Sequence, residues 1–239
     1  DRLVLAATSG GSAQLWAVIP TELVPEVLTS LVDAFPIRRL AAQAIGDRAL
    51  FVATLPAPPS DSRDHLFLSD GTAIGTIDVA GGCDAAGSCG IRDLGTMGGV
   101  AYFVVSDSGG TSLWRTDGTV PGTAEIEAFD CASGCEMRTF GVSEARLYFL
   151  KGSPGVSPAL WVTDGFAAGT FEVLAPGPID PSGVTGAGSV ALPGNRLVFA
   201  AHDVESGFEP WISDGTPSGT HVIVNLSTAS DPSQPKRFS

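Results

Sequence analysis

The most singular polar cluster in the sequence combines an imidazole with two carboxylates, at His202, Asp203 and Glu205. Side chains of these types can hold a cation, exchange a proton, or accept the backbone N–H groups of a loop. Three further acidic candidates come from other irregular segments: Asp61, Asp64 and Asp107. We predict that these residues contribute to a ligand-binding site, with calcium as the candidate metal. A solvated acidic rim that binds nothing is the alternative.

Recognisable catalytic motifs are missing from the sequence. Its three histidines are His65, His202 and His221, and the last two have no evident serine or cysteine nucleophile nearby. No G-x-S-x-G, H-E-x-x-H or phosphate-binding glycine loop occurs. We therefore assign no catalytic residue. A carboxylate pair facing across a central axis stays open, because sequence spacing cannot reveal such a separation.

Composition restricts the class of partner. The chain has 239 residues, a formal net charge of −13, a sequence pI near 4.4 and 44% hydrophobic residues. A chain of this length and apolar content can bury a core. The negative charge opposes binding to nucleic acid or anionic lipid, and no apolar run reaches the roughly 18–20 residues of a membrane span. We expect an acidic globular protein with no nucleic-acid partner and no membrane insertion.

Four copies of one phrase organise the chain around these candidates. Each copy has an apolar strand end, then Asp-Gly, usually Thr, and then Gly-Thr. The aspartates of the copies are Asp70, Asp117, Asp164 and Asp214, spaced 47, 47 and 50 residues apart. A degraded fifth copy keeps only Leu15-Trp16. Short alternating apolar runs precede and follow each phrase, which is the pattern of β-strands.

The length of the repeat predicts the fold. Four short antiparallel strands in a unit of about 48 residues are typical of a β-propeller blade. We predict an all-β, five-bladed β-propeller with four antiparallel strands per blade, forming one domain over residues 1–239. The predicted blades are 236–239 with 1–33, then 34–80, 91–128, 137–175 and 188–226. The C-terminal strand, Lys236-Arg237-Phe238, would join the N-terminal blade and close the ring.

The phrase from Leu113 to Thr123, L-W-R-T-D-G-T-V-P-G-T, resembles the E-L-W-x-x-D-G-T-x-x-G-T repeat of secreted bacterial propeller proteins described as hyalin-like. The segment from Phe199 to Trp211 is similar to the strand–loop–strand part of that family. The first unit lacks the Asp-Gly-Thr turn, and Phe166 stands where Thr is usual. The resemblance spans essentially the whole chain and implies a propeller exported from a bacterial cell. It implies no general catalytic activity.

The four repeated aspartates have a structural interpretation. Asp-Gly between two alternating runs is a hairpin signal, because Gly accepts positive φ and the carboxylate accepts backbone N–H groups. A residue present in every repeat normally serves the fold. We therefore assign these aspartates to turns, with metal ligation or acid catalysis as the alternative. The repeated aromatic residues are expected to pack between sheets, with stacking on a sugar as the alternative: Trp16, Phe67, Trp114, Trp161 and Trp211.

Three arginines begin the second strands of predicted blades, on the face that carries the Asp-Gly turns. Opposite charges at the same end of one blade can pair, with modest energy where they are exposed. We expect three ion pairs within blades: Arg48 with Asp70, Arg146 with Asp164, and Arg196 with Asp214. The third repeat has Asp117 but no arginine at this place.

Four cysteines follow two successive repeats at equivalent places: Cys83, Cys89, Cys131 and Cys135. Their even number and local spacing predict two disulfides, Cys83–Cys89 and Cys131–Cys135, and an oxidising compartment. A four-thiolate zinc site is the alternative, for which the two halves would have to converge from adjacent blades.

The rigid repeats, the lack of a catalytic constellation and the cysteine pattern together favour a binding module outside the cytoplasm. We expect a secreted, periplasmic or cell-surface protein that docks on a protein partner or a glycan through the face with the long loops. The alternative function is a carbohydrate-active hydrolase or lyase that uses acidic residues of the same face.

Overall fold

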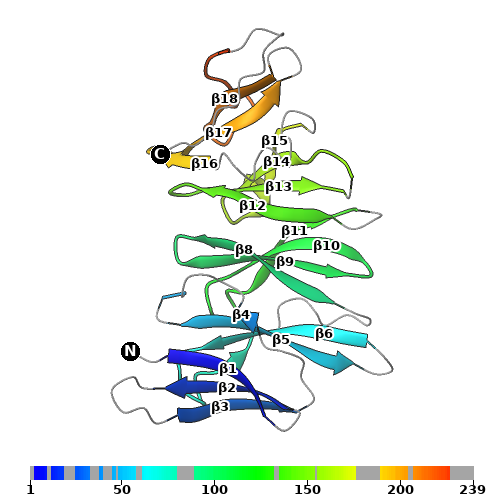
Figure 1. Ribbon diagram of the computed structural model, residues 1–239, viewed down its shortest axis with the longest axis vertical. Coiled ribbons are helices and arrows are strands. Elements are labelled where there is room, and N and C mark those ends of the chain that lie inside the picture. The colour runs from blue at the N-terminus through cyan, green and yellow to red at the C-terminus, as the bar shows by residue number, and fades with distance from the viewer. Residues whose placement is uncertain are drawn as a thin grey trace. The chain divides into compact units, whose positions relative to one another are not determined.

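The computed structural model consists almost entirely of antiparallel β-sheet (Figure 1). It describes residues 3–9, 12–18, 25–32, 38–39, 45–46, 48–57, 61–79, 89–131, 135–153, 155–175, 189–203 and 207–226. Within these ranges the only helical element is a single 3₁₀ turn, η1 (Ala167–Gly169). The predicted all-β, antiparallel class is confirmed. The chain divides into two compact units, Asp1–Asp130 and Cys131–Ser239.

The first unit contains three sheets in which each strand pairs antiparallel with the next strand of the sequence. The first sheet has β1 (Leu3–Ser9), β2 (Ser12–Val18) and β3 (Pro25–Val32). The second has β4 (Arg38–Arg39), β5 (Ala49–Ala57), β6 (Asp61–Ser69) and β7 (Ile77–Asp78). The third has β8 (Gly90–Met97), β9 (Val100–Asp107), β10 (Gly110–Thr116) and β11 (Ala124–Phe129).

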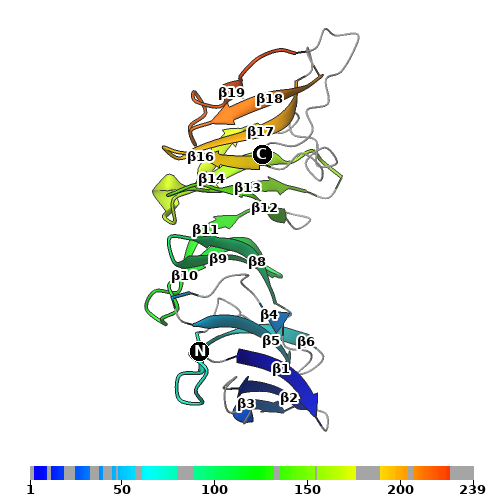
Figure 2. The same cartoon turned by 60° about the vertical axis from the view of Figure 1, so that its left-hand side comes forward.

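The second unit contains two four-stranded sheets of the same design. One has β12 (Glu136–Val142), β13 (Leu147–Gly152), β14 (Ala159–Thr163) and β15 (Phe171–Leu174). The other has β16 (Ser189–Leu192), β17 (Arg196–Asp203), β18 (Gly207–Ser213) and β19 (His221–Val222), which lie side by side in Figure 2.

A bulge recurs where the strand that carries the repeated aromatic residue pairs with the strand that follows it in the sequence. The register shifts between Leu15 and Trp16, and again between Leu113 and Trp114. A β-bulge adds one residue to one strand and increases the local twist. In the third sheet this shift places Trp114 opposite Glu125 and Leu113 opposite Glu127. The bulge therefore decides which acidic residues of β11 share a face with the tryptophan.

The core of the first unit lies between its second and third sheets. Leu66 and Leu68 of β6 meet Ile91 of β8 and Phe103 of β9, and each of these side chains is fully buried. Burying one such side chain stabilises the fold by about 1.5–3 kcal/mol. Trp114 packs at the edge of this cluster, as expected for an aromatic residue between sheets.

The second unit repeats this arrangement between its two sheets. Phe140 of β12 packs edge-on against Phe199 of β17, with ring centroids 5.2 Å apart. The Tyr148 hydroxyl donates to the Asn195 carbonyl at 2.9 Å, and the Asn195 side chain accepts the Ala145 N–H at 2.8 Å. Apolar packing and hydrogen bonds therefore both join the two sheets.

Two of the predicted ion pairs take a different form. Arg146 extends past its own sheet and lies against Gly215 in the turn after β18, where its charge helps lower the pKa of Asp214. Arg196 donates from Nε to the Pro193 carbonyl at 3.0 Å. The predicted pairing within blades was wrong for Arg146, because the long side chain reaches the turn of the neighbouring sheet.

The strand predicted to close the ring, Lys236-Arg237-Phe238, lies outside the described residues. The first sheet, which that strand would complete, has three strands among the described residues, whereas the other sheets have four.

Candidate functional site

The repeated Asp-Gly-Thr phrases form hydrogen-bonded turns between third and fourth strands. After β6, Asp70 Oδ1 accepts both the backbone N–H of Thr72 (2.8 Å) and its hydroxyl (2.7 Å). The Thr72 hydroxyl oxygen accepts the Gly75 N–H at 2.9 Å, and the Thr76 hydroxyl donates to the Thr72 carbonyl at 2.7 Å. The turns at Asp117 and Asp214 contain the same set of bonds. Each of these carboxylates therefore acts on its own turn.

Two glycines are required by this geometry. Gly71 has φ of 85°, a left-handed conformation that other residues rarely adopt. A Cβ on Gly75 would overlap the carboxylate of Asp70. The Asp-Gly and Gly-Thr parts of the phrase therefore belong to a single hydrogen-bonded unit.

The turn after β14 departs from the other three. Phe166 replaces the threonine, and only its backbone N–H reaches Asp164 Oδ1, at 3.0 Å. The short η1 helix follows, with the Gly169 N–H donating to the Phe166 carbonyl at 3.0 Å. The Phe166 side chain is 60% exposed. This turn keeps the bond from the Thr170 hydroxyl to the Phe166 carbonyl (2.9 Å) but lacks the two bonds made by the threonine hydroxyl of its relatives, and it presents an aromatic ring to solvent.

The turn hydrogen bonds alter the acidity of two of these aspartates. The Thr72 hydroxyl lowers the pKa of Asp70 below its ordinary value of 3.8, and the nearby Arg48 charge adds a smaller effect. The Thr216 hydroxyl lowers the pKa of Asp214 in the same way, with Arg146 contributing less. Both carboxyls are stabilised as anions because hydrogen-bond donors favour the charged form.

Asp64, one of the predicted ligand-binding residues, lies in the interior. Its side chain is 6% exposed and accepts hydrogen bonds from the Thr54 hydroxyl and, at 2.7 Å, from the Ile91 N–H. The Asp64 N–H in turn donates to the Cys89 carbonyl at 3.1 Å. These bonds connect the second sheet with the third, which is a structural task for this carboxylate.

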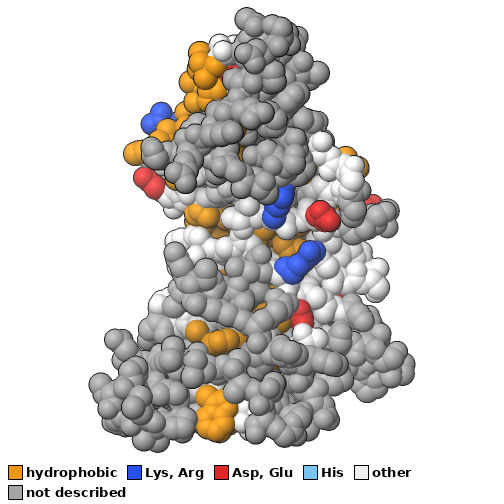
Figure 3. All heavy atoms as spheres, viewed as in Figure 1, with side chains coloured by type: hydrophobic (Ala, Val, Ile, Leu, Met, Phe, Trp, Pro, Cys, Tyr) orange, Lys and Arg blue, Asp and Glu red, His pale blue; other side chains and the backbone are white. Residues whose placement is uncertain are grey.

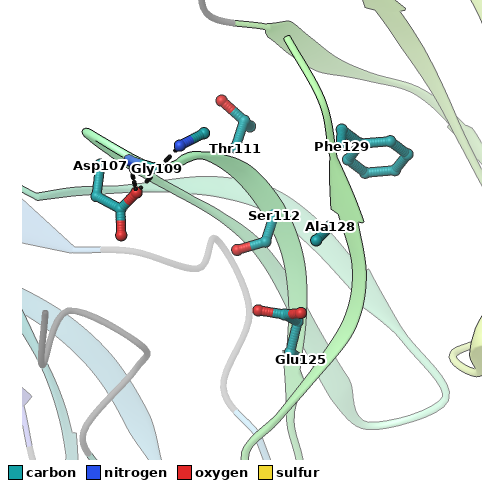
Figure 4. Close-up of a pocket in the computed structure, with 8 residues that line it drawn as sticks. Asp107, Gly109, Thr111, Ser112, Glu125, Ala128 and Phe129 are labelled. Atoms are coloured by element: carbon teal, nitrogen blue, oxygen red, sulfur yellow. Dashed lines mark hydrogen bonds between the residues drawn. The ribbon is translucent and has the colours of Figure 1, made fainter.

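Asp107, another predicted residue, borders a pocket at one end of the third sheet (Figure 4). Asp107 Oδ1 accepts the N–H groups of Gly109 (2.7 Å) and Gly110 (3.2 Å), which fixes the hairpin between β9 and β10. The pocket has a volume of about 190 Å³. Its lining residues are Asp107, Gly109, Gly110, Thr111, Ser112, Glu125, Ala128 and Phe129.

Three polar residues of this pocket were not predicted from the sequence: Thr111, which is 4% exposed, and the more accessible Ser112 and Glu125. In Figure 4 the side chains of Ser112 and Glu125 project from neighbouring strands β10 and β11 on the side where Asp107 lies. The Ser112 oxygen accepts the indole N–H of Trp114 at 2.8 Å, which orients the hydroxyl. The position two residues before the repeated aromatic residue differs between the repeats of this chain, being Ser112 here and His65, Ala159 or Glu209 elsewhere, and this variation was a usable signal.

None of the remaining predicted ligand residues is among the residues that line this pocket. The backbones of Asp61, His202 and Asp203 lie in strands β6 and β17, and nothing of their side chains is described. Glu205 lies outside the described residues. The assignment of these residues to a ligand site stays a prediction.

One predicted disulfide is present, between Cys131 and Cys135. Cys89 is also disulfide-bonded, whereas Cys83 lies outside the described residues. The Cys83–Cys89 pairing therefore stays a prediction.

Two kinds of feature are absent from the described residues. These residues contain no group of three or more His, Cys, Asp or Glu side chains placed to hold a metal ion. None of their helices is long and apolar enough to cross a membrane. On the face in Figure 3, the basic and acidic side chains of the described part form no large patch of one sign.

No family model matches the chain, and no curated protein matches it. Among solved structures, a puromycin hydrolase mutant complexed with PGG is similar at 17% identity and a TM-score of 0.49, covering 98% of this chain and 38% of that one. Oligogalacturonate lyase in complex with manganese has 12% identity and a TM-score of 0.48, covering 98% of this chain and 65% of that one. TolB from Acinetobacter baumannii has 12% identity and a TM-score of 0.41, covering 90% of this chain and 49% of that one. The chain thus spans less than two thirds of each of these proteins, and likenesses this distant carry no argument about function.

Proposed function

We propose that this protein is a binding module that works outside the cytoplasm and docks on a protein partner or a glycan. The observation that supports the proposal is the pocket bordered by Asp107, Ser112 and Glu125, a concave polar site at the end of a well-packed sheet. Binding residues commonly lie on loops held by a rigid scaffold. The Asp-Gly-Thr turns, by contrast, use their polar groups internally.

The position of this pocket fits the proposed docking face. The pocket is lined in part by the hairpin between β9 and β10, the second and third strands of their sheet. In the second sheet the corresponding strands are β5 and β6, and β6 begins at Asp61. Because each sheet has its strands in the same sequential antiparallel order, the connection between second and third strands leaves every sheet at the same end. We infer that this end of the sheets is the docking face and that the opposite end carries the structural turns.

The five-bladed ring belongs to this proposal. Four meanders of four strands and one of three strands supply the expected units, and the C-terminal residues would complete the three-stranded sheet. A closed compact domain of this length should have a radius of gyration of about 18 Å. Small-angle X-ray scattering should give this value, whereas a substantially larger radius would contradict closure.

The proposed location outside the cytoplasm is supported by the Cys131–Cys135 disulfide. Disulfides persist in oxidising compartments and are rare in the cytosol. Fractionation of the native cells, followed by immunodetection of the full-length protein in each fraction, tests the location directly. Recovery of the mature protein only in the cytosol would overturn it.

A glycan array probed with and without calcium tests the proposed function. Binding that needs calcium would support a metal-assisted lectin, and binding without it would support a direct glycan site. If neither condition gives binding, glycan docking is excluded and protein docking is tested by cross-linking in the native cell envelope. Failure of both arms overturns the binding module. Release of sugar or unsaturated product from the array would support the hydrolase or lyase alternative instead.

A further inference from the structure

The pocket of the third sheet is shaped by three strands and has a lining of a particular chemistry. Its polar side chains are two carboxylates, Asp107 and Glu125, and two hydroxyls, Thr111 and Ser112. No Lys, Arg or His side chain is among the lining residues. Carboxylates are negatively charged hydrogen-bond acceptors, and the hydroxyls are neutral. A pocket lined by these groups favours a ligand that donates hydrogen bonds and carries positive charge.

The acceptors of this pocket are only partly used by the protein. Both backbone donors to Asp107 reach the same oxygen, Oδ1, so Oδ2 accepts no hydrogen bond from the described residues. The Glu125 carboxylate likewise accepts none from the described residues, as Figure 4 shows within the pocket. The Ser112 oxygen already accepts a bond from Trp114, which leaves its own proton available for donation. Asp107 is held in place by its two hairpin bonds and Glu125 is exposed, so both carboxylates are open to a donor that approaches from outside.

The same geometry argues against a sugar in this pocket. Sugar sites usually offer the open face of an aromatic ring beside hydrogen-bonding groups. Phe129 is 7% exposed, and the Trp114 ring is stacked on Phe103 at 6.3 Å between centroids. The volume of about 190 Å³ is also below the roughly 300–1,000 Å³ of typical small-molecule sites. A single inserted side chain fits this volume better than an oligosaccharide.

We propose that the pocket receives the cationic end of an arginine side chain from a protein partner. The proposal rests on the proposed function, since it names the partner for the docking face. A planar guanidinium has five donors in a fixed arrangement and is less strongly hydrated than an ammonium group. One guanidinium can therefore donate to more than one acceptor of the lining, whereas a lysine would bind as a single point charge.

Titration with short peptides tests this assignment on the whole chain. The probes are N-acetylated, C-amidated Gly-Arg-Gly, Gly-Lys-Gly and Gly-Gln-Gly, added to ¹⁵N-labelled protein and followed by the amide signals of Gly109, Gly110 and Ser112. The arginine peptide should shift these signals with a dissociation constant on the order of millimolar, because a single exposed charge contact contributes little. The lysine peptide should bind more weakly, and the glutamine peptide should cause no shift.

Three variants identify the groups involved. Glu125→Gln and Asp107→Asn should each weaken binding about 3- to 10-fold. Asp107→Asn keeps an oxygen for the N–H groups of Gly109 and Gly110, so the hairpin should survive. Glu127→Gln is the matched control, because it removes the same charge from the same strand at a residue that does not line the pocket.

Several outcomes overturn the proposal. Equal weakening by Glu127→Gln would show nonspecific attraction to an acidic protein, and equal shifts from the glutamine peptide would remove the role of charge. Saturation of the same signals by calcium chloride alone, with displacement of the arginine peptide, would assign the pocket to a metal. A lack of shifts with all three peptides would discard the arginine pocket, while docking seen in the array or by cross-linking would leave the binding module intact.

Discussion

The carboxylate of Asp64 accepts a hydrogen bond from the backbone N–H of Ile91 at 2.7 Å, across the boundary between two sheets. Asp64 lies in β6 and Ile91 in β8, and the Thr54 hydroxyl donates to the same carboxylate. Asp64 was predicted from the sequence to bind a ligand, but its carboxylate instead joins two successive repeats through buried hydrogen bonds. A buried carboxylate with charge-assisted bonds stabilises strongly as long as its donors remain paired.

Removing this carboxylate should destabilise the first unit. Asp64→Ala leaves the Ile91 N–H without its acceptor in a buried place, which costs about 2–3 kcal/mol. Asp64→Asn retains one acceptor oxygen and should cost less. Urea unfolding followed by tryptophan fluorescence measures both. Asp130→Ala, at an exposed position, is the control and should change the free energy of unfolding by less than about 0.5 kcal/mol; an equal loss in this control would contradict the assigned role.

The turn at Phe166 can be repaired. Phe166→Thr should restore the hydroxyl bonds seen at Thr72, Thr119 and Thr216 and remove an exposed aromatic ring. We expect a gain of about 1–2 kcal/mol, since each net hydrogen bond contributes about 0.5–1.5 kcal/mol. The melting temperature measures the change. Thr119→Ala is the reverse experiment and should destabilise by a similar amount; stabilisation by Thr119→Ala would show that the hydroxyl does not hold the turn.

The sequence predicts the strands and turns well because their determinants are local. Asp70, Thr72 and Gly75 contact one another within six residues, so the repeated phrase already contains the whole hydrogen-bond unit. The reach of Arg146 to the neighbouring sheet depends on the spacing of two sheets, which no repeat pattern records. The pairing of Trp114 with Glu125 depends on a bulge that shifts the register by one residue. The candidate pocket was therefore predicted only at Asp107.

Stability should fall in acid partly because of Asp214. Its pKa is lower in the folded protein than its ordinary value of 3.8, chiefly because the Thr216 hydroxyl donates to it. A depressed pKa contributes stability that is present above the unfolded pKa and is lost as the pH falls through the folded pKa. Thr216→Val should therefore lose more stability at pH 6 than at a pH below both pKa values, where the lost bond from the Gly219 N–H is the main remaining cost. Urea midpoints at the two pH values measure this difference.

Asp214→Asn is the control for that experiment, since an amide does not titrate in this range. Its stability should depend less on pH than that of the unmodified protein. If Thr216→Val instead lowers stability equally at both pH values, the hydroxyl acts without regard to the charge of Asp214, and the electrostatic explanation fails.

Asn195 joins two sheets from a strained backbone, and its two contributions can be separated. Its φ is 60°, a conformation that costs most residues about 1–2 kcal/mol, and its side chain accepts the Ala145 N–H at 2.8 Å. Asn195→Gly removes the side-chain acceptor and tolerates the backbone, whereas Asn195→Ala removes the acceptor and adds strain. Asn195→Ala should therefore be less stable than Asn195→Gly by about 1 kcal/mol. Tyr148→Phe tests the second hydrogen bond of Asn195, since it removes the hydroxyl that donates to the Asn195 carbonyl. Combining it with Asn195→Gly shows whether the two bonds act independently. Additive losses would mean two separate connections, and a combined loss smaller than the sum would mean that Tyr148 and Asn195 hold the two sheets of the second unit as one coupled contact.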